Sequence, residues 1–537
     1  FATDTTTTSN RSLPWKNSTT LPKLTQIRDN LHSNYLSSLF PNDDWLSWIA
    51  FSKEAKSRKK ASTIKAYMDN KTREGNFRTE MSKLLYDYID YGNAFATVSF
   101  ESNQKELASG EIVPGFIGPR VKRISPLDIV FDPTADDFES TFKIVRSIKT
   151  LGELKKRAIT EPDEAFWQKA VERRELLQSS IGGIKDDDFE KAVSYQVDGF
   201  GNLQEYYQSE YVEILEFYGD YHDRTTGELE TNRILTVVDR SIVVRDEPMP
   251  NWQAHAPIAH VGWRFRQDNL WAMGPLDNLV GMQYRIDHIE NIKADAMDLA
   301  IHPPLIIAGE VEAFDWGPGA EIHIDENGSV TEVAKNLNTV FTADNQIQSL
   351  KDDMELMAGA PRQAMGVRTP GEKTATEVQQ LENAAGRIFQ EKINNFEIEL
   401  LEKILNDMLE IAARNLNQSD VIRVLDNDIG VENFLSITKA DITANGRIRP
   451  VGARHFAKQA QDLQNIIGIM NSPIGQTIAP HTSGKALTKF VDDVTGLKGY
   501  NIFRENVAVT EQQETQSLAN QAQEDLDAEG QVPLEDA

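Results

Sequence analysis

The stretch from residue 274 to residue 416 constrains the fold most, because long helical patterns alternate there with a β-rich insert. Gly274 and Pro275 open a segment in which apolar residues recur at helical spacing for about 25 residues, or roughly 38 Å of helix. This apolar stripe consists of Leu279, Met282, Ile286, Ile289, Ile292, Ala296 and Leu299. Pro303 and Pro304 end the pattern, because proline does not continue a helix.

A β-rich insert is expected after this helix. Short β-type runs occur at residues 305–307, 321–324 and 330–333, with glycine and asparagine between them for turns. Phe314 and Trp316 lie in the insert, where they either anchor a partner protein or fill the small core of the insert itself. Helical periodicity then resumes at Ile347, Leu350, Met354 and Met357.

A loop with three basic side chains is expected at residues 361–373. Proline and glycine residues break the helical pattern there, and the basic side chains are Arg362, Arg368 and Lys373. A capping box at residues 374–377 begins another helix, which is expected to reach Leu416, about 43 residues or some 64 Å. Gly386 allows a bend within that helix.

The remaining chain mixes helical and strand patterns. Helices are expected at residues 22–39, 62–91, within 151–209, 453–470 and 485–494. Strands are expected at residues 95–100, 120–124, 129–131, 211–221, 234–238, 242–244, 421–425 and 442–448, of which 211–244 forms an antiparallel meander. The expected fold class is therefore α+β, mainly helical.

Charge and composition restrict the function. The chain of 537 residues has a formal net charge of −27, which opposes simple binding to phosphate backbones, so that DNA would pass along this protein and not be gripped by it. Cysteine is absent, which excludes disulfides and thiolate metal sites and favours a reducing compartment. No window is apolar enough to span a membrane, and residues 1–20 have no apolar signal core. The basic cluster of residues 53–60 is read as a solvated helix face, with contact to DNA or a partner as the alternative.

No motif in the sequence indicates an enzyme. Residues 366–374 resemble a phosphate-binding loop, but Glu372 separates the last glycine from Lys373, so the lysine is out of register for a nucleotide. His255 and His260 lack the spacing of a metal site and are expected to be ordinary polar or core side chains. The acidic group Asp132, Asp136 and Asp137 is read as a turn, with a metal site as the alternative. We expect no catalytic residues, no cofactor and no metal.

The order of helix, β insert, helix, basic loop and very long helix resembles the portal proteins of tailed bacteriophages. Several local strings agree with that family. They are residues 87–95 (DYIDYGNAF), residues 121–133 (VKRISPLDIVFDP), residues 274–277 (GPLD) with Gln283 and Asp287, and residues 374–378 (TATEV). The resemblance covers residues 24–500, and the order of the strings is its most specific part.

The resemblance implies a function and a set of partners. Portal proteins form a homo-oligomeric ring of about twelve subunits at one capsid vertex, which serves DNA packaging and ejection. Double-stranded DNA passes through the channel, and the ring contacts the major capsid protein, the terminase large subunit and later the tail adaptor protein. The implied location is the virion, with assembly in the host bacterial cytoplasm. Arg362, Arg368 and Lys373 would touch the DNA transiently, whereas Phe314 and Trp316 would bind the partner proteins.

The family's parts are a wing, a stem, a clip and a crown. Applied to this chain, they give the following division: 1–20, a disordered N-terminal segment; 21–273, wing; 274–300, first stem helix; 301–340, clip; 341–360, second stem helix; 361–373, tunnel loop; 374–416, long wing helix; 417–452, wing return strands; 453–510, crown helices; and 511–537, an acidic tail. The alternative function is another structural protein of a virion, such as a tail adaptor or a minor capsid protein.

Overall fold

The structure is a computed structural model. It describes residues 17–358 and 390–450 except for internal gaps at 41–44, 51–54, 107–111, 161–164, 180–202, 224–226, 241, 252–254, 302–304, 310–322, 325–327, 333–337, 417–419, 427–430 and 444–445. The helices are α1 (Lys23–Leu39), α2 (Ala55–Glu74), α3 (Phe77–Asp90), α4 (Leu151–Thr160), α5 (Ala165–Ser179), α7 (Leu203–Gln208), α8 (Val280–Ile301), α9 (Asn338–Met357), α11 (Lys403–Asn415) and α12 (Lys439–Ile442).

The strands form small antiparallel sheets. They are β1 (Leu46–Ala50), β2 (Asn93–Glu106), β3 (Ile112–Ile124), β4 (Ile129–Phe131), β5 (Lys143–Thr150), β6 (Tyr211–His222), β7 (Leu229–Val238), β8 (Ile242–Pro248), β9 (Ile258–Gly262), β10 (Arg264–Arg266), β11 (Asn269–Met273), β12 (Leu305–Ala308), β13 (Ser329–Glu332), β14 (Asp420–Asp426), β15 (Val431–Ile437) and β16 (Gly446–Pro450).

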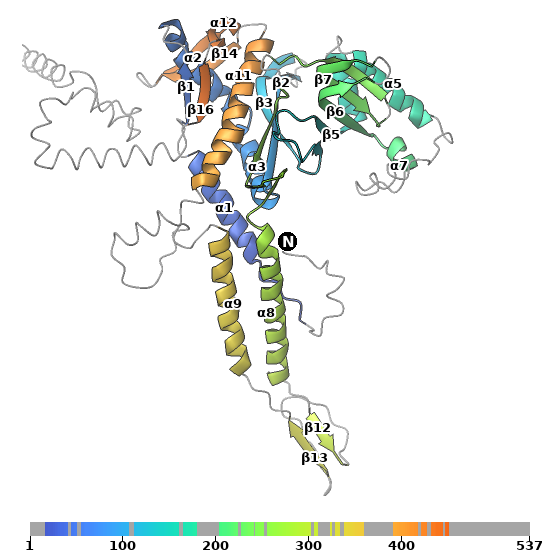
Figure 1. Ribbon diagram of the computed structural model, residues 1–537, viewed down its shortest axis with the longest axis vertical. Coiled ribbons are helices and arrows are strands. Elements are labelled where there is room, and N and C mark those ends of the chain that lie inside the picture. Colours follow the sequence, from blue (N-terminus) through green and yellow to red (C-terminus); the bar gives the residue numbers. More distant parts are fainter. Residues whose placement is uncertain are drawn as a thin grey trace, which may run out of the picture.

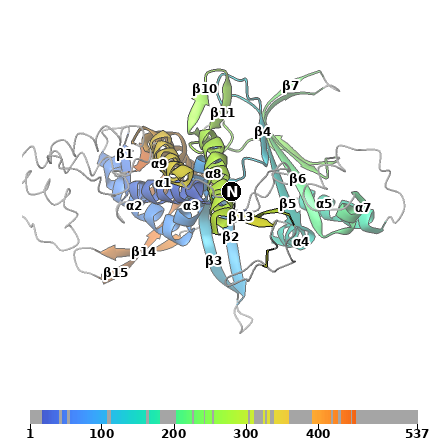
Figure 2. The same ribbon diagram turned by 90° about the horizontal axis from the view of Figure 1, so that it is seen from below.

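The described chain has four parts that Figure 1 separates clearly. The body contains α1, α2, α3 and α11 packed around the sheet β3-β2-β9 and the pair β1-β16. The lobe at its side contains the five-stranded sheet β4-β5-β6-β7-β8 with α4, α5 and α7. The helix pair, α8 and α9, projects from the body, and the terminal hairpin, β12 and β13, lies at its far end. Seen from below in Figure 2, the lobe lies to one side of this projection.

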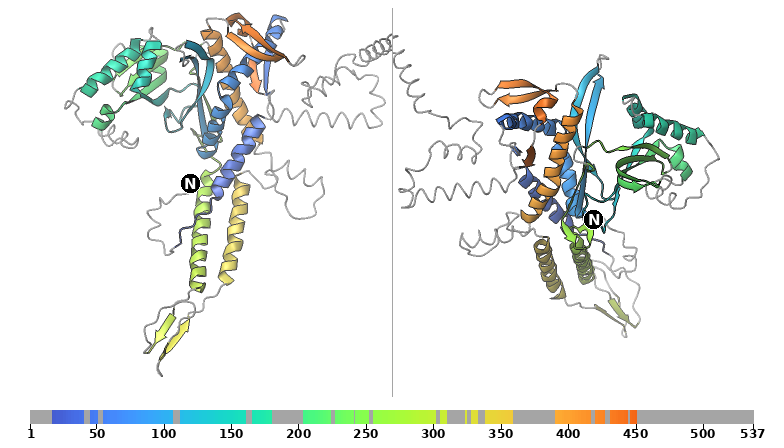
Figure 3. Two further views of the ribbon diagram at one scale, coloured as in Figure 1. Left: turned by 180° about the vertical axis from the view of Figure 1, so that it is seen from behind. Right: turned by 45° about the horizontal axis from the view of Figure 1, so that its top comes forward.

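Helix α1 follows from the spacing of its apolar residues. Ile27, Leu31, Tyr35 and Leu39 recur at four and all are buried in the body core, so the predicted helix at 22–39 is confirmed. Tyr35 also accepts a hydrogen bond from the indole Nε1 of Trp263, at 3.2 Å. In Figure 3, α1 runs from the body down to the upper end of the helix pair.

The helical region expected at residues 62–91 is two helices and not one. α2 ends at Glu74, and α3 begins at Phe77 after Asn76 adopts a left-handed backbone conformation, with φ of 56°. A Cβ atom on Gly75 would lie 2.8 Å from the carbonyl oxygen of Lys71, which a glycine avoids. Gly75 and Asn76 are residue types that tolerate such a turn, so the sequence contained the break that periodicity alone did not reveal.

The sheets of the lobe confirm the predicted meander. β6, β7 and β8 are consecutive antiparallel neighbours, and Asp239 and Arg240 both have positive φ in the turn between β7 and β8. α4 and α5 cover one face of the sheet over Val212, Ile214 and Val238. Arg174 of α5 is fully buried there and donates hydrogen bonds to the carbonyl oxygen of Tyr211 and to the carboxylate of Asp239.

The expectation of a mainly helical chain is wrong. The described residues are 48% helical and 33% strand, with several antiparallel sheets, so the fold is mixed α/β. β2 is longer than the alternating run that predicted it, because it continues past residue 100 through polar positions; β3 begins at Ile112, eight residues before the predicted run. Cross-strand pairing stabilises those polar positions, and a sequence pattern that counts apolar residues does not detect it.

The C-terminal expectations are met in part. Residues 390–396 are helical, Glu397–Glu402 forms a π-helical turn, and α11 ends at Asn415, whereas residues 374–389 lie outside the described residues. The expected strand at 421–425 is β14, but the strand expected at 442–448 is the short helix α12 followed by β16, which pairs with β1. Residues 453–510 and 511–537 also lie outside the described residues. Within the described part of the chain, no helix is long and apolar enough to cross a membrane.

Candidate functional site

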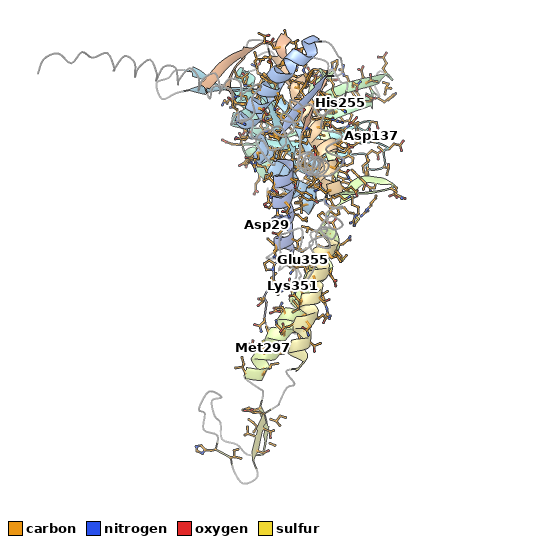
Figure 4. The ribbon with its side chains drawn as sticks, turned by 90° about the vertical axis from the view of Figure 1, so that its left-hand side faces the viewer. Asp29, Asp137, His255, Met297, Lys351 and Glu355 are labelled. Carbon is orange, nitrogen blue, oxygen red and sulfur yellow. The ribbon has the colours of Figure 1, made fainter. Side chains whose placement is uncertain are left out.

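The helix pair projects from the body and carries the terminal hairpin at its far end. α8 and α9 have 22 and 20 residues, about 33 and 30 Å at 1.5 Å per residue. They pack antiparallel, with Ile286 and Ile289 of α8 and Ile347 and Met354 of α9 buried in a core that is continuous with the body. Figure 4 shows Glu355 and Lys351 toward the body and Met297 near the far end.

An ion pair joins α8 to α9. Lys293 of α8 donates to the carboxylate of Asp344 of α9 at 2.9 Å and to Glu290 of its own helix at 2.6 Å. Burial lowers the pKa of Lys293, but Glu290 and Asp344 together have the greater effect, so its pKa is raised. In all, α8 and α9 contain eight acidic and three basic side chains, so the helix pair is acidic.

Large apolar side chains remain exposed along this acidic pair. Ile301 and Leu356, near opposite ends of the pair, are each 69% exposed. Others that are exposed are Tyr284, Ile292, Met297 and Leu299 on α8 and Met357 on α9. Single exposed apolar residues are normal on a protein surface, but a run of them on a thin projection is typical of a surface that another protein covers.

The apolar stripe predicted for α8 therefore divides into two halves. Leu279, Ile286 and Ile289 are buried against the body and α9, whereas Ile292 and Leu299 are exposed. Because one α9 helix cannot surround α8, the outer half of the stripe is only partly covered among the described residues. The terminal hairpin does not supply it, since Ile306 and Ile307 of β12 are themselves more than half exposed.

The terminal hairpin is also open at its edges. β12 and β13 pair only with each other within the described residues, from Leu305 opposite Glu332 to Ala308 opposite Ser329. Two strands alone are marginally stable in water, and an unpaired edge exposes backbone donors and acceptors to another chain. The hairpin is therefore a second surface suited to a protein partner.

The five residues that the sequence predicted as functional lie outside the described residues. In the sequence, Phe314 and Trp316 lie between β12 and β13. Arg362, Arg368 and Lys373 follow α9, whose last residues return to the body. The roles of all five side chains therefore remain predictions.

Asp132 and His260, which were considered above as metal ligands, have structural roles. The carboxylate of Asp132 accepts hydrogen bonds from the backbone N–H of Thr134, at 2.9 Å, and from its hydroxyl, at 2.7 Å, as in an ordinary turn. The ring of His260 stacks on Phe95, with 4.4 Å between centroids, and lies 3.1 Å from the side-chain oxygen of Asn93. In the described ranges, no group of three or more histidine, aspartate or glutamate side chains is arranged to hold a metal ion.

One buried carboxyl does couple to pH. Asp407 of α11 is 4% exposed, and burial, followed by the nearby Glu410 and Glu139, raises its pKa to about 7, although Lys403 acts against this. His255 Nε2 lies 3.6 Å from one carboxylate oxygen of Asp407. The folded-state pKa exceeds that of the unfolded chain, so this group stabilises the fold at low pH and the stabilisation is lost as pH rises toward 7.

Replacing Asp407 with asparagine should remove this loss. We expect the unfolding free energy of Asp407→Asn, measured relative to wild type, to increase between pH 4 and pH 7 by up to about 4 kcal/mol, from a pKa difference of about three units. Chemical denaturation at several pH values measures it. Parallel profiles for the two proteins would contradict the assignment.

The buried His260 acts in the opposite sense, because burial lowers its pKa to about 3 and its stabilisation is lost as pH falls below 6.5.

One row of polar side chains on α8 has a role that the sequence did not predict, although Gln283 and Asp287 were part of the resemblance noted above. Gln283, Asp287, Asn291 and Asp295 recur every four residues and line one side of the helix, where they bind the backbone of residues 17–24. Residues 17–20, expected to be part of a disordered segment, therefore lie against α8. The detectable signal was the fourfold spacing of amide and carboxylate side chains beside an apolar stripe.

No family model matches the chain, and no curated protein matches it. The function is therefore inferred from the residues and the geometry described above. The helix pair, with its exposed apolar side chains, and the terminal hairpin, with its open strand edges, are the surfaces best suited to binding another protein.

Proposed function

We propose that this chain is the portal protein of a tailed bacteriophage, one subunit of a ring at a capsid vertex through which the genome is packaged and ejected. The observation that carries the proposal is the helix pair, a projection of about 30 Å whose outer apolar side chains are exposed. In a ring of copies, neighbouring helix pairs would lie side by side and cover those side chains.

The charge of the helix pair supports a channel for DNA. Eight acidic side chains against three basic ones repel phosphate groups, so that a duplex surrounded by such pairs would slide without adhering. Arg362, Arg368 and Lys373 would then supply the few transient contacts to the duplex. The energy for packaging would come from a separate ATPase, the terminase large subunit.

The terminal hairpin supports contacts with other virion proteins. It lies at the far end of the helix pair, and its strands have open edges in the described residues. Together with Phe314 and Trp316, it would bind the terminase large subunit and later the tail adaptor. The body and the lobe would contact the capsid side of the ring, including the major capsid protein.

The mass of the purified protein tests the proposal. A ring of twelve copies of the 60.4 kDa chain would have a mass of about 725 kDa by mass photometry. Averaged electron micrographs viewed down the ring axis should show a central channel. A monomer as the sole species over a wide range of concentration and salt would contradict the portal function, and a ring without a channel would favour another structural protein of the virion.

A further inference from the structure

An extended N-terminal segment is bound along α8 through its backbone. The N–H groups of Asn17, Thr19 and Leu21 donate to side-chain oxygens of α8. Their acceptors are Asp295, at 3.0 Å, Asn291, at 2.6 Å, and Asp287, at 2.9 Å. The side-chain amide of Asn17 adds bonds to Asp295, at 2.7 Å, and to Asp298, at 2.9 Å.

The spacing of the acceptors along α8 matches the spacing of the N–H groups along the bound segment. Four residues of helix rise about 6.0 Å, and two residues of extended chain rise about 6.6 Å. Every second N–H of the segment therefore meets every fourth residue of α8, over three consecutive pairs. Each of the three helix side chains is an amide or a carboxylate, and each presents an oxygen acceptor to a backbone donor.

The same segment continues into the body. Gln283 of α8 accepts from the N–H of Leu24, at 3.2 Å, and donates to the carbonyl oxygen of Leu21. Lys23, 8% exposed, forms a buried ion pair with Glu355 of α9. From there α1 enters the body core, and Arg28 binds the carboxylate of Asp90 on α3 at 2.7 Å. One short stretch thus contacts α8, α9 and the body.

We propose that the side-chain row Gln283, Asp287, Asn291 and Asp295 is a recognition site for an extended polypeptide segment, and that residues 17–24 occupy it as a strap that holds the helix pair on the body. The site is polar: Asp295, Asn291 and Asp287 accept from the backbone at every second position, Gln283 accepts from Leu24, and the side chain of Asn17 adds two bonds. It therefore differs from the apolar surface proposed for contacts between subunits, and it operates whether or not the chain assembles into a ring.

Three consecutive residues with hydroxyl side chains allow a test that isolates the backbone. Ser18, Thr19 and Thr20 are all exposed, but among the described residues only Thr19 of these three donates its N–H to α8. Proline lacks the N–H group and tolerates extended backbone. Thr19→Pro should make amide hydrogen exchange in α8 and at the start of α1 about tenfold faster, whereas Ser18→Pro and Thr20→Pro should leave it unchanged.

The measurement is hydrogen-exchange mass spectrometry on the full-length protein. Equal effects of all three proline variants, or no effect of Thr19→Pro, would overturn the strap. A second variant, Lys23→Met, removes the ion pair to Glu355 and should raise exchange in α9 more than in the five-stranded sheet of the lobe. Exchange that increases equally in both would show that Lys23 supports the whole fold and not the attachment of the pair. The mass of the assembly is measured separately. If the protein is a monomer and only Thr19→Pro speeds exchange, the portal function is rejected and the strap is retained.

Discussion

Gly92→Ala is expected to prevent the body from folding. Gly92 joins α3 to β2 with φ of +70°, a conformation that side-chain-bearing residues adopt with strain. A Cβ atom there would lie 2.3 Å from the backbone nitrogen of Gly274 and 2.4 Å from the carbonyl carbon of Met273. Both are backbone atoms of the segment that leads into α8, so neither can move aside as a flexible side chain would. We expect a loss of at least about 4 kcal/mol in unfolding free energy.

Gly281→Ala is the matched control for this substitution. Gly281 lies in the first turn of α8, and a Cβ atom there meets no heavy atom within 4 Å among the described residues. Alanine favours the helix, so this variant should be unchanged or more stable by up to about 1 kcal/mol. Thermal and chemical denaturation of both variants give the comparison. If Gly92→Ala retained wild-type stability, the close approach of residues 92 and 274 would be wrong.

Elements whose burial follows a regular period were predictable from the sequence. The bounds of α1 were predicted to within one residue from the spacing of Ile27, Leu31, Tyr35 and Leu39. The meander of β6 to β8 was predicted from the alternation of apolar and polar residues. The extent of β2 was not predictable, because its outer half pairs through polar residues such as Gln104 and Lys105. The break between α2 and α3 depends on a left-handed Asn76, which a periodic pattern does not encode.

The candidate site also combines features that the sequence predicted with features that it did not. The stripe containing Ile292 and Leu299 was predicted from spacing, but only the structure shows that these two side chains are exposed. The fourfold polar row on α8 was detectable in the sequence, but the segment bound to it was not, because it binds through backbone N–H groups, and Asn17, Thr19 and Leu21 share no side-chain property. The roles of Arg362, Arg368, Lys373, Phe314 and Trp316 stay predictions, since all five lie outside the described residues.

The second large effect is expected from charges placed on the outer stripe of α8. Ile292 is 44% exposed and Leu299 is 38% exposed, so neither contributes much to the core of a single chain. In the proposed ring both side chains become buried between neighbouring helix pairs. Asp at these positions would bury an unpaired charge at every contact around the ring, which costs several kcal/mol at each one. We therefore expect Ile292→Asp with Leu299→Asp to convert a species of about 725 kDa to one of about 60 kDa.

The control must be an exposed apolar residue away from the helix pair. Leu127, in the turn between β3 and β4, is 77% exposed, so Leu127→Asp adds the same charge to the same kind of site. This variant should keep the mass of the wild type. Circular dichroism and denaturation should show that the double variant on α8 is folded, because its two positions are already partly solvated in one chain. A folded double variant that still forms a ring of full mass would show that the outer stripe of α8 is not a contact between subunits. A loss of mass in both variants would instead show that assembly responds to added negative charge anywhere on a chain whose net charge is already −27.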